Sequence, residues 1–133
     1  MKIYTSYFGN IKNIPPHIWP LSIARQRPDW YGGSELDIVA PSSPLLHKYH
    51  SEEINWDEFS TLYRAELDSL DPVEVLQIID DLVWSNDVCL LCYEKPEEHC
   101  HRHILASWLT DNVGQHIEGE RVEEYIKTGG GLI

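Results

Sequence analysis

One segment, residues 88–103, holds most of the side chains in this sequence that could do chemistry. It includes three cysteines, three histidines, an arginine and the glutamate that follows the apolar run: Cys89, Cys92, Glu94, His99, Cys100, His101, Arg102 and His103. Residues 88–93 are continuously apolar, which is typical of a strand covered on both faces of a parallel sheet. Ligands of open α/β sheets bind outside the carboxyl ends of strands, so we expect a site where this strand ends.

Metal binding is the first chemistry that these residues suggest. Cys89 and Cys92 have the spacing of a zinc-ligand pair, but residues three apart on a strand point to opposite faces. We therefore interpret Cys89 as a buried structural cysteine. His99 and His103 would share a helix face only if the next helix began early, with a nearby thiol or carboxylate completing the set. The alternative is that these imidazoles bind nothing, and we expect neither a metal nor a cofactor.

An anion or nucleophile site at a helix N-terminus is the other possibility. Amides of a first turn attract negative charge, and Arg102 would add a bidentate fork. The thiolate of Cys100 would be favoured by the helix dipole, His101 and Arg102 together. A tight phosphate cradle is not encoded, because the interval from Cys92 to Arg102 is long and has no glycine. Equally, Cys100 could be an inert core thiol, with Arg102 pairing with Glu94 or Glu98.

The elements that must position these residues alternate between strands and helices. Strands are predicted at residues 3–8, 18–24 and 88–93, with weaker ones near 36–39 and 116–117. Helices are predicted at residues 43–49, after the caps at Asn55 and Asp71, from about residue 100 to 113, and at 121–127. This alternation predicts an α/β fold with a small, mostly parallel sheet of roughly 3 to 5 strands flanked by helices. We expect a single compact domain over residues 1–133.

The predicted strands end in polar side chains that could meet at one sheet edge. Ser6 ends the first strand, Ser22 and Arg25 follow the second, and Glu94 and Arg102 follow the third. Because parallel strands align their carboxyl ends, we expect Arg25, Glu94 and Arg102 to converge.

Composition limits the classes of function. The 22 acidic residues outnumber the 10 basic ones, and the net charge of −12 disfavours nucleic acid and anionic membranes as partners. The chain shows no secretory signal or stretch of about 18 apolar residues, so we expect a cytoplasmic protein. Three cysteines in a chain of this size do not form a disulfide framework, and we expect buried, metal-binding or reactive thiols.

The chain also resembles a known family, the one catalogued as domain of unknown function 488. The resemblance rests on residues 90–96, 99–102 and 105–109, and, for one branch of the family, on residues 2–8, 22–25 and Trp30. It implies a compact α/β domain and brings no established reaction. The matching positions of the family pattern are Cys92, Glu94, Cys100, His101 and Arg102, whereas Cys89, His99 and His103 fall at variable places.

From these observations we expect a small cytoplasmic enzyme that acts on an anionic or nucleotide-like ligand. The expected roles are Cys100 or Cys92 as nucleophile, His101 or Glu94 as general acid or base, and Arg25, Arg102, Ser6 and Ser22 as ligand-binding residues. The alternatives are a non-catalytic binding or regulatory module that uses the same pocket and, less readily, a metal-binding protein. The sequence does not identify the substrate, the reaction or the oligomeric state.

Overall fold

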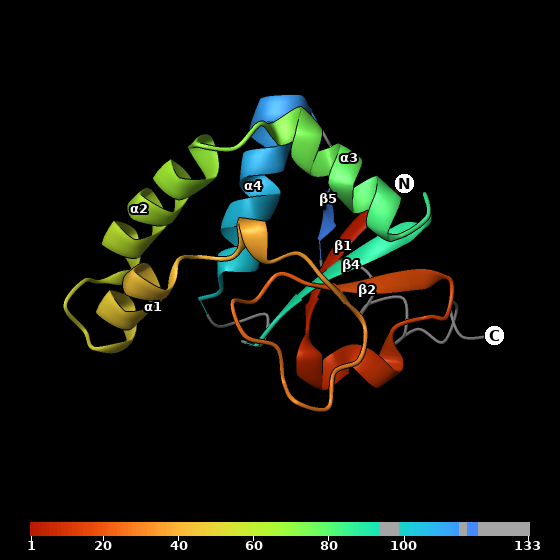
Figure 1. Cartoon of the computed structure of the whole chain (residues 1–133), viewed down its shortest axis with the longest axis horizontal. Coiled ribbons are helices and arrows are strands. Elements are labelled where there is room, and N and C mark those ends of the chain that lie inside the picture. Colours follow the sequence, from red (N-terminus) through yellow and green to blue (C-terminus); the bar gives the residue numbers. More distant parts are fainter. Residues whose placement is uncertain (94–98, 115–116, 120–133) are drawn as a thin grey trace.

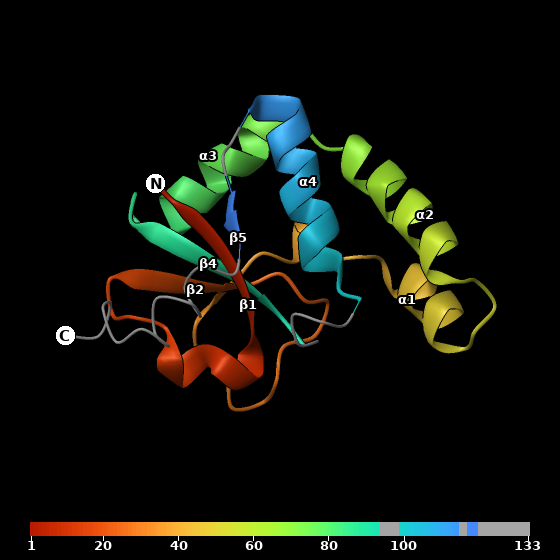
Figure 2. The ribbon, with the colours of Figure 1, turned by 180° about the vertical axis from the view of Figure 1, so that it is seen from behind.

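A computed structural model describes residues 1–93, 99–114 and 117–119 and has the expected α/β fold (Figure 1). Its strands are β1 (Ile3–Tyr7), β2 (Ile18–Ser22), β3 (Ser34–Glu35), β4 (Asp87–Cys92) and β5 (Ile117–Gly119). They form one sheet in the order β3-β2-β4-β1-β5, and every pair of neighbours is parallel. The longest strand, β4, therefore lies at the centre of the sheet, and β5 lies at one edge beside β1 (Figure 2).

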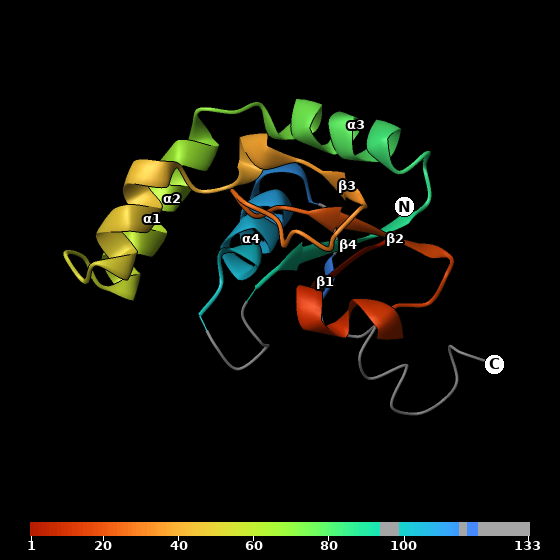
Figure 3. The same ribbon diagram turned by 60° about the horizontal axis from the view of Figure 1, so that its bottom comes forward.

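Helices cover both faces of this sheet. They are the 3-10 helices η1 (Phe8–Asn13) and η2 (Asp37–Val39) and the α-helices α1 (Ser43–His50), α2 (Trp56–Asp68), α3 (Pro72–Leu82) and α4 (His101–Val113). The α-helices α3 and α4 cover one face and η1 the other. Helix α4 lies between the sheet and the pair formed by α1 and α2 (Figure 3). The fold therefore packs α4 against the sheet, including β4, on one side and against α2 on another.

The expected helix caps are present and explain why the helices begin where they do. Asn55 and Glu58 form a reciprocal capping box at the start of α2. The side chain of Asp71 accepts from the first amides of α3, and Pro72 occupies the first helical position. Helix α4 differs, because its N-cap is Cys100 and no side chain caps it.

The register of the sheet decides which side chains share a face. Ser6 of β1 and Ser22 of β2 both align with Leu91 of β4, so all three point to the same side. Leu91 belongs to the buried cluster on the η1 face, whereas Cys92 belongs to the cluster beneath the α-helices. The carboxyl ends of the three central strands thus align, but their side chains divide between two faces.

The prediction of a strand at residues 36–39 is wrong. The strand lies earlier, at Ser34–Glu35, and Asp37–Val39 forms a 3-10 helix. Leu36 and Val39 are both buried, and a spacing of three matches the 3-10 repeat rather than the alternation of a strand. The predicted helix at 121–127 falls outside the described residues. Across the described ranges, we found no helix that combines the length and the apolar character needed to span a membrane.

Candidate functional site

The strongest candidate site lies where β4 ends and α4 begins. Cys92 is the last residue of β4, Cys100 is the N-cap of α4, and the two are joined by a disulfide bond. Both side chains are buried. From the sequence we expected buried, metal-binding or reactive thiols, and this disulfide corrects that expectation for Cys92 and Cys100. The end of the strand and the start of the helix bring together two sulfurs that are eight residues apart. Cys89 is free and buried, as predicted for a structural cysteine.

His101 lies beside this cysteine pair with both ring nitrogens in defined surroundings. Its Nε2 is 2.8 Å from the backbone carbonyl of Ile23, and its Nδ1 is 4.0 Å from Sγ of Cys100. The ring of Tyr63 packs against the imidazole edge-on at 5.6 Å. These contacts bury His101 and fix the direction of its ring.

The protonation state of His101 follows from these neighbours. Burial is the main cause that lowers its pKa from 6.5 to about 4, opposed by the bond to Ile23 and assisted by the charge of Arg102. The ring is therefore neutral at neutral pH. A carbonyl can only accept, so the single proton belongs on Nε2. Nδ1 then presents a lone pair towards Cys100.

Arg102 is fully buried, although the sequence suggested an anion clamp. Its NH1 group is 3.2 Å from Sγ of Cys92 and donates to it. The two residues after Cys100 therefore approach the two sulfurs from different directions, with His101 beside Cys100 and Arg102 beside Cys92. A buried cation next to a sulfur favours its thiolate form.

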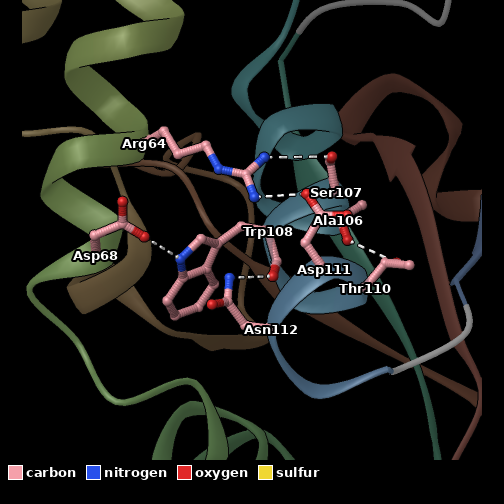
Figure 4. Close-up of polar contacts among 8 residues, drawn as sticks. All are labelled: Arg64, Asp68, Ala106, Ser107, Trp108, Thr110, Asp111 and Asn112. Atoms are coloured by element: carbon pink, nitrogen blue, oxygen red, sulfur yellow. Dashed lines mark hydrogen bonds and ion pairs between the residues drawn. The ribbon is translucent and has the colours of Figure 1, made fainter.

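A first cavity, of about 740 Å³, lies between α2 and α4 and is called the interhelix cavity. Its wall includes Trp56, Arg64, Asp68, His99, Cys100 and His103. Figure 4 shows the side chains that hold the two helices together along it: Arg64 reaches Ser107 and Asp111, and Asp68 accepts from the indole of Trp108 at 2.9 Å. Cys100 is the cysteine that lines this cavity.

A second cavity, of about 600 Å³, lies on the other side of the α4 N-terminus and is called the histidine cavity. Its wall includes Arg25, Gln26, His47, His50, Tyr93 and His101. The two cavities share no lining residue among those described. Neighbouring residues of α4 thus face different spaces, with Cys100 in one and His101 in the other.

The comparison with known families agrees with the expected resemblance. Residues 16–113 match the sequence model of a family described as the "Active DUF488-N3 subclade". The chain belongs to the DUF488 family. The matched region of this member runs from before β2 to the end of α4, so it contains both cysteines of the disulfide, His101 and Arg102. No curated protein matches the chain, and no solved structure does.

The predicted ligand-binding residues are spread over more than one place in this DUF488 member. Arg25 lines the histidine cavity with His101, but Cys100 does not. Ser6 and Ser22 are buried on the η1 face, where Ser6 accepts from the Asn10 side chain and Ser22 from the amide of Ala24. The sheet therefore separates the two serines from Cys92 and Cys100, which belong to the cluster on the other face. Glu94 lies outside the described residues.

The donors that could hold a metal differ from those weighed in the sequence. Cys92, Cys100 and His101 each offer one ligand atom, and these atoms lie within 4.8 Å of one another. His99 precedes the first residue of α4 and stacks on Trp56 at 4.6 Å, so the early helix start that a His99 and His103 pair required is absent. Two thiolates and an imidazole would suit zinc, but in this structure the sulfurs are bonded to each other.

Sequence reasoning missed several residues that line the two cavities. His47 and His50 are exposed on α1, and Arg64 lies on α2, far from the cysteines in the chain. The spacing of three between the histidines was the available signal, since it places both on one helix face. Nothing in the sequence indicates that α1 lies opposite the N-terminus of α4.

Proposed function

We propose that this protein is a cysteine-dependent enzyme that acts on a small anionic ligand, with Cys100 as nucleophile and His101 as its base. One observation carries the proposal: the proton of His101 is committed to the Ile23 carbonyl, which turns the Nδ1 lone pair towards Cys100. A nucleophile beside a base that a third group orients is the arrangement that activates a weak nucleophile.

Two further features favour a thiolate at this cysteine pair, one acting on each sulfur. As the N-cap of α4 it lies at the positive end of a helix of 13 residues, where negative charge is stabilised. The guanidinium of Arg102 lies beside the partner sulfur of Cys92. The same first turn would attract an anionic group in the interhelix cavity, where Arg64 and His103 lie together with one described acid, Asp68.

The reduced dithiol is the competent form, because both sulfurs are occupied in the disulfide. We propose a cytoplasmic location on this ground, since reductants there keep thiols reduced. The Cys100 proton passes to Nδ1 of His101, and sulfur bonds to the electrophilic atom as the leaving group departs with its electron pair and that proton. Water then attacks the same atom, giving one proton to Nδ1 and releasing the Cys100 thiolate.

Alkylation of the reduced full-length chain tests this proposal without knowledge of the substrate. Peptide mapping after iodoacetate or iodoacetamide treatment, from pH 5 to 9, gives the rate at each cysteine. We expect Cys100 to react well below the usual thiol pKa of about 8.5, and iodoacetate to be favoured over iodoacetamide relative to a small free thiol. Cys89 should react only after unfolding.

Variants separate the roles of the residues. His101→Gln can still donate to the Ile23 carbonyl but offers no lone pair of comparable basicity, so it should slow alkylation at neutral pH. Arg64→Gln should lower the preference for iodoacetate without slowing alkylation by iodoacetamide. His17→Gln changes an exposed residue elsewhere and should alter neither the alkylation rate nor this preference. A Cys100 that reacts like a free thiol in both wild type and His101→Gln would refute the proposal.

A non-catalytic binding module is the second candidate, and one observation favours it. The histidine cavity has the cationic lining expected of an anion site, yet no cysteine is among its lining residues. In that case ligand binding would be the same in the Cys100→Ser variant as in the wild type.

A further inference from the structure

Among the described residues, the histidine cavity is lined by no cysteine and shares only His101 with the thiol chemistry proposed above. The loop after β2 contributes Arg25 and Gln26, α1 contributes His47 and His50, and β4 is followed by Tyr93. Among the described residues that line it, none is an aspartate or glutamate. In a chain with a net charge of −12, the part of this lining that the structure describes is thus neutral or cationic. Its volume of about 600 Å³ suits a small organic ligand.

Arg25 is held in place by backbone carbonyls rather than by an acid. Its Nε donates to the carbonyl of Pro41 and its NH2 to that of Ala40, each at 3.1 Å. These bonds use two of the five N–H groups of the guanidinium and leave its positive charge uncompensated by them. A guanidinium fixed in this way is suited to bidentate contact with a phosphate.

The helix side of the cavity supplies further donors. His47 and His50 are three residues apart on α1, and both are exposed at the cavity. Imidazole N–H groups bind phosphate oxygens, and their position on a helix keeps them at a fixed spacing. Arg25 and these two histidines thus line one cavity and all offer N–H donors to an anionic group.

Tyr93 adds a different kind of surface to the same cavity. The residue is 51% exposed, its hydroxyl donates to the Gln26 carbonyl at 2.7 Å, and its ring meets that of Phe8 in a T-shaped contact with centroids 5.1 Å apart. Trp30, 60% exposed, rests on the same Phe8 at 6.3 Å. Tyr93 is thus a rigid aromatic ring, anchored at both ends, that borders a cationic cavity.

We propose that the histidine cavity binds a nucleoside monophosphate, with its phosphate on Arg25, His47 and His50 and its base stacked on Tyr93. Aromatic side chains hold single bases by stacking, whichever the base. The charge of −12 opposes a polynucleotide, which leaves the mononucleotide as the ligand. The inference goes beyond the proposed enzyme because it requires no thiol, and binding should be equal in the oxidised and reduced protein.

Equilibrium binding measured by calorimetry on the full chain tests the inference. The probes are adenosine monophosphate, ribose 5-phosphate, adenosine and inorganic phosphate. We expect adenosine monophosphate to bind at least about fivefold more tightly than ribose 5-phosphate, the lower limit for one stacked base. Tyr93→Leu should remove that difference and leave ribose 5-phosphate unaffected, whereas His50→Gln and Arg25→Lys should weaken both phosphates.

Matched controls keep the result interpretable. Lys12→Gln is an exposed cation change away from the cavity, and Trp84→Leu removes an exposed aromatic ring that precedes β4; neither should change any affinity. His50→Gln alters an exposed residue, so it preserves the test if the Arg25 variant unfolds. Equal affinity for adenosine monophosphate and ribose 5-phosphate, no binding at millimolar concentration, or tighter binding of a single-stranded oligonucleotide would each overturn the proposal.

Discussion

His101 is the residue whose surroundings are most fully defined at the site. Burial against Tyr63 disfavours its charged form, and the Ile23 carbonyl chooses its tautomer. The same burial that prepares Nδ1 as an acceptor also makes folding depend on pH. The proposed catalysis and the stability of the fold therefore both depend on whether Nδ1 of His101 is protonated, and stability is the easier of the two to measure.

Acidification should destabilise the wild type through this imidazole. The pKa of His101 is lowered from 6.5 to about 4 in the folded protein, so between these values the unfolded chain binds a proton that the folded chain does not. The free energy of unfolding is therefore unaffected by this imidazole above about pH 6.5. It falls as the pH is lowered towards 4, by up to about 3 kcal/mol. Burial lowers the pKa of His103 too, so acidification should also reduce stability through this residue.

Urea unfolding at pH 7 and pH 4.5 measures this loss. The His101→Gln variant should lose less stability than the wild type between the two pH values, because the glutamine does not titrate. His17→Gln should behave like the wild type, since His17 is exposed. Identical pH dependence in all three proteins would show that His101 does not carry the effect.

Zinc content is a second test at the residue scale. Three potential donor atoms converge, and the guanidinium of Arg102 lies 3.2 Å from one of them, Sγ of Cys92. A cation there already stabilises the sulfur and would repel a dication, so we expect well under one zinc per chain in protein purified without chelator. Elemental analysis decides this. About one tightly held zinc, lost in Cys100→Ala, would contradict it and would occupy the proposed nucleophile.

At the scale of elements, the position of α4 depends on its contact with α2. The buried indole of Trp108 donates to Asp68, whereas Arg64 and Asp111 form an exposed ion pair at 2.6 Å on the same interface (Figure 4). Removing the acceptor of a buried donor costs more than removing a surface ion pair. The first contact therefore contributes more to holding α4, and with it Cys100, against the sheet.

Asp68→Leu should lower the free energy of unfolding by about 1–3 kcal/mol, because it leaves the indole N–H without its acceptor. Asp68→Asn keeps an oxygen for that bond and should lose less. Asp111→Asn should cost under about 1 kcal/mol, as is usual for surface pairs. Chemical denaturation of the three variants ranks their free energies of unfolding. A larger loss of stability for Asp111→Asn than for Asp68→Leu would show that the surface ion pair, and not the Trp108 bond, is the stronger contact.

The elements themselves could be predicted where local chemistry sets them. The caps at Asn55 and Asp71 and the apolar run of β4 act through neighbours in the sequence, and the structure confirms them. The start of α4 could not be fixed, because no side chain caps it. That one boundary decides whether His99 belongs to the helix.

At the scale of the whole molecule, the parallel sheet was predictable but the composition of each cavity was not. Alternating strands and helices indicate parallel pairing, which the structure confirms. The faces of Ser6 and Ser22 depend on a register of β1 and β2 with β4 that no local pattern encodes. The pairing of Cys92 with Cys100 depends likewise on where α4 docks. Sequence reasoning could identify the reactive residues but not the space that each one faces.

The redox state of the cysteine pair should change the stability of the entire chain. A bond between residues eight apart removes conformational freedom from the unfolded state, and a loop of this length corresponds to about 2–3 kcal/mol. The oxidised protein should therefore unfold at a higher urea concentration than the protein in dithiothreitol. Intact mass measurement, with a loss of two hydrogens on oxidation, reports which form is present.

The double variant Cys92→Ser/Cys100→Ser retains Cys89 and should show one unfolding midpoint with or without dithiothreitol. If the wild type also showed a single midpoint while its mass confirmed the bond, the loss of freedom in the unfolded chain would be offset by strain in the folded one. The bond joins the end of β4 to the start of α4, so strain of this kind would act directly on the N-terminus of α4. Reduction would then release the residues that flank both cavities instead of loosening the chain as a whole.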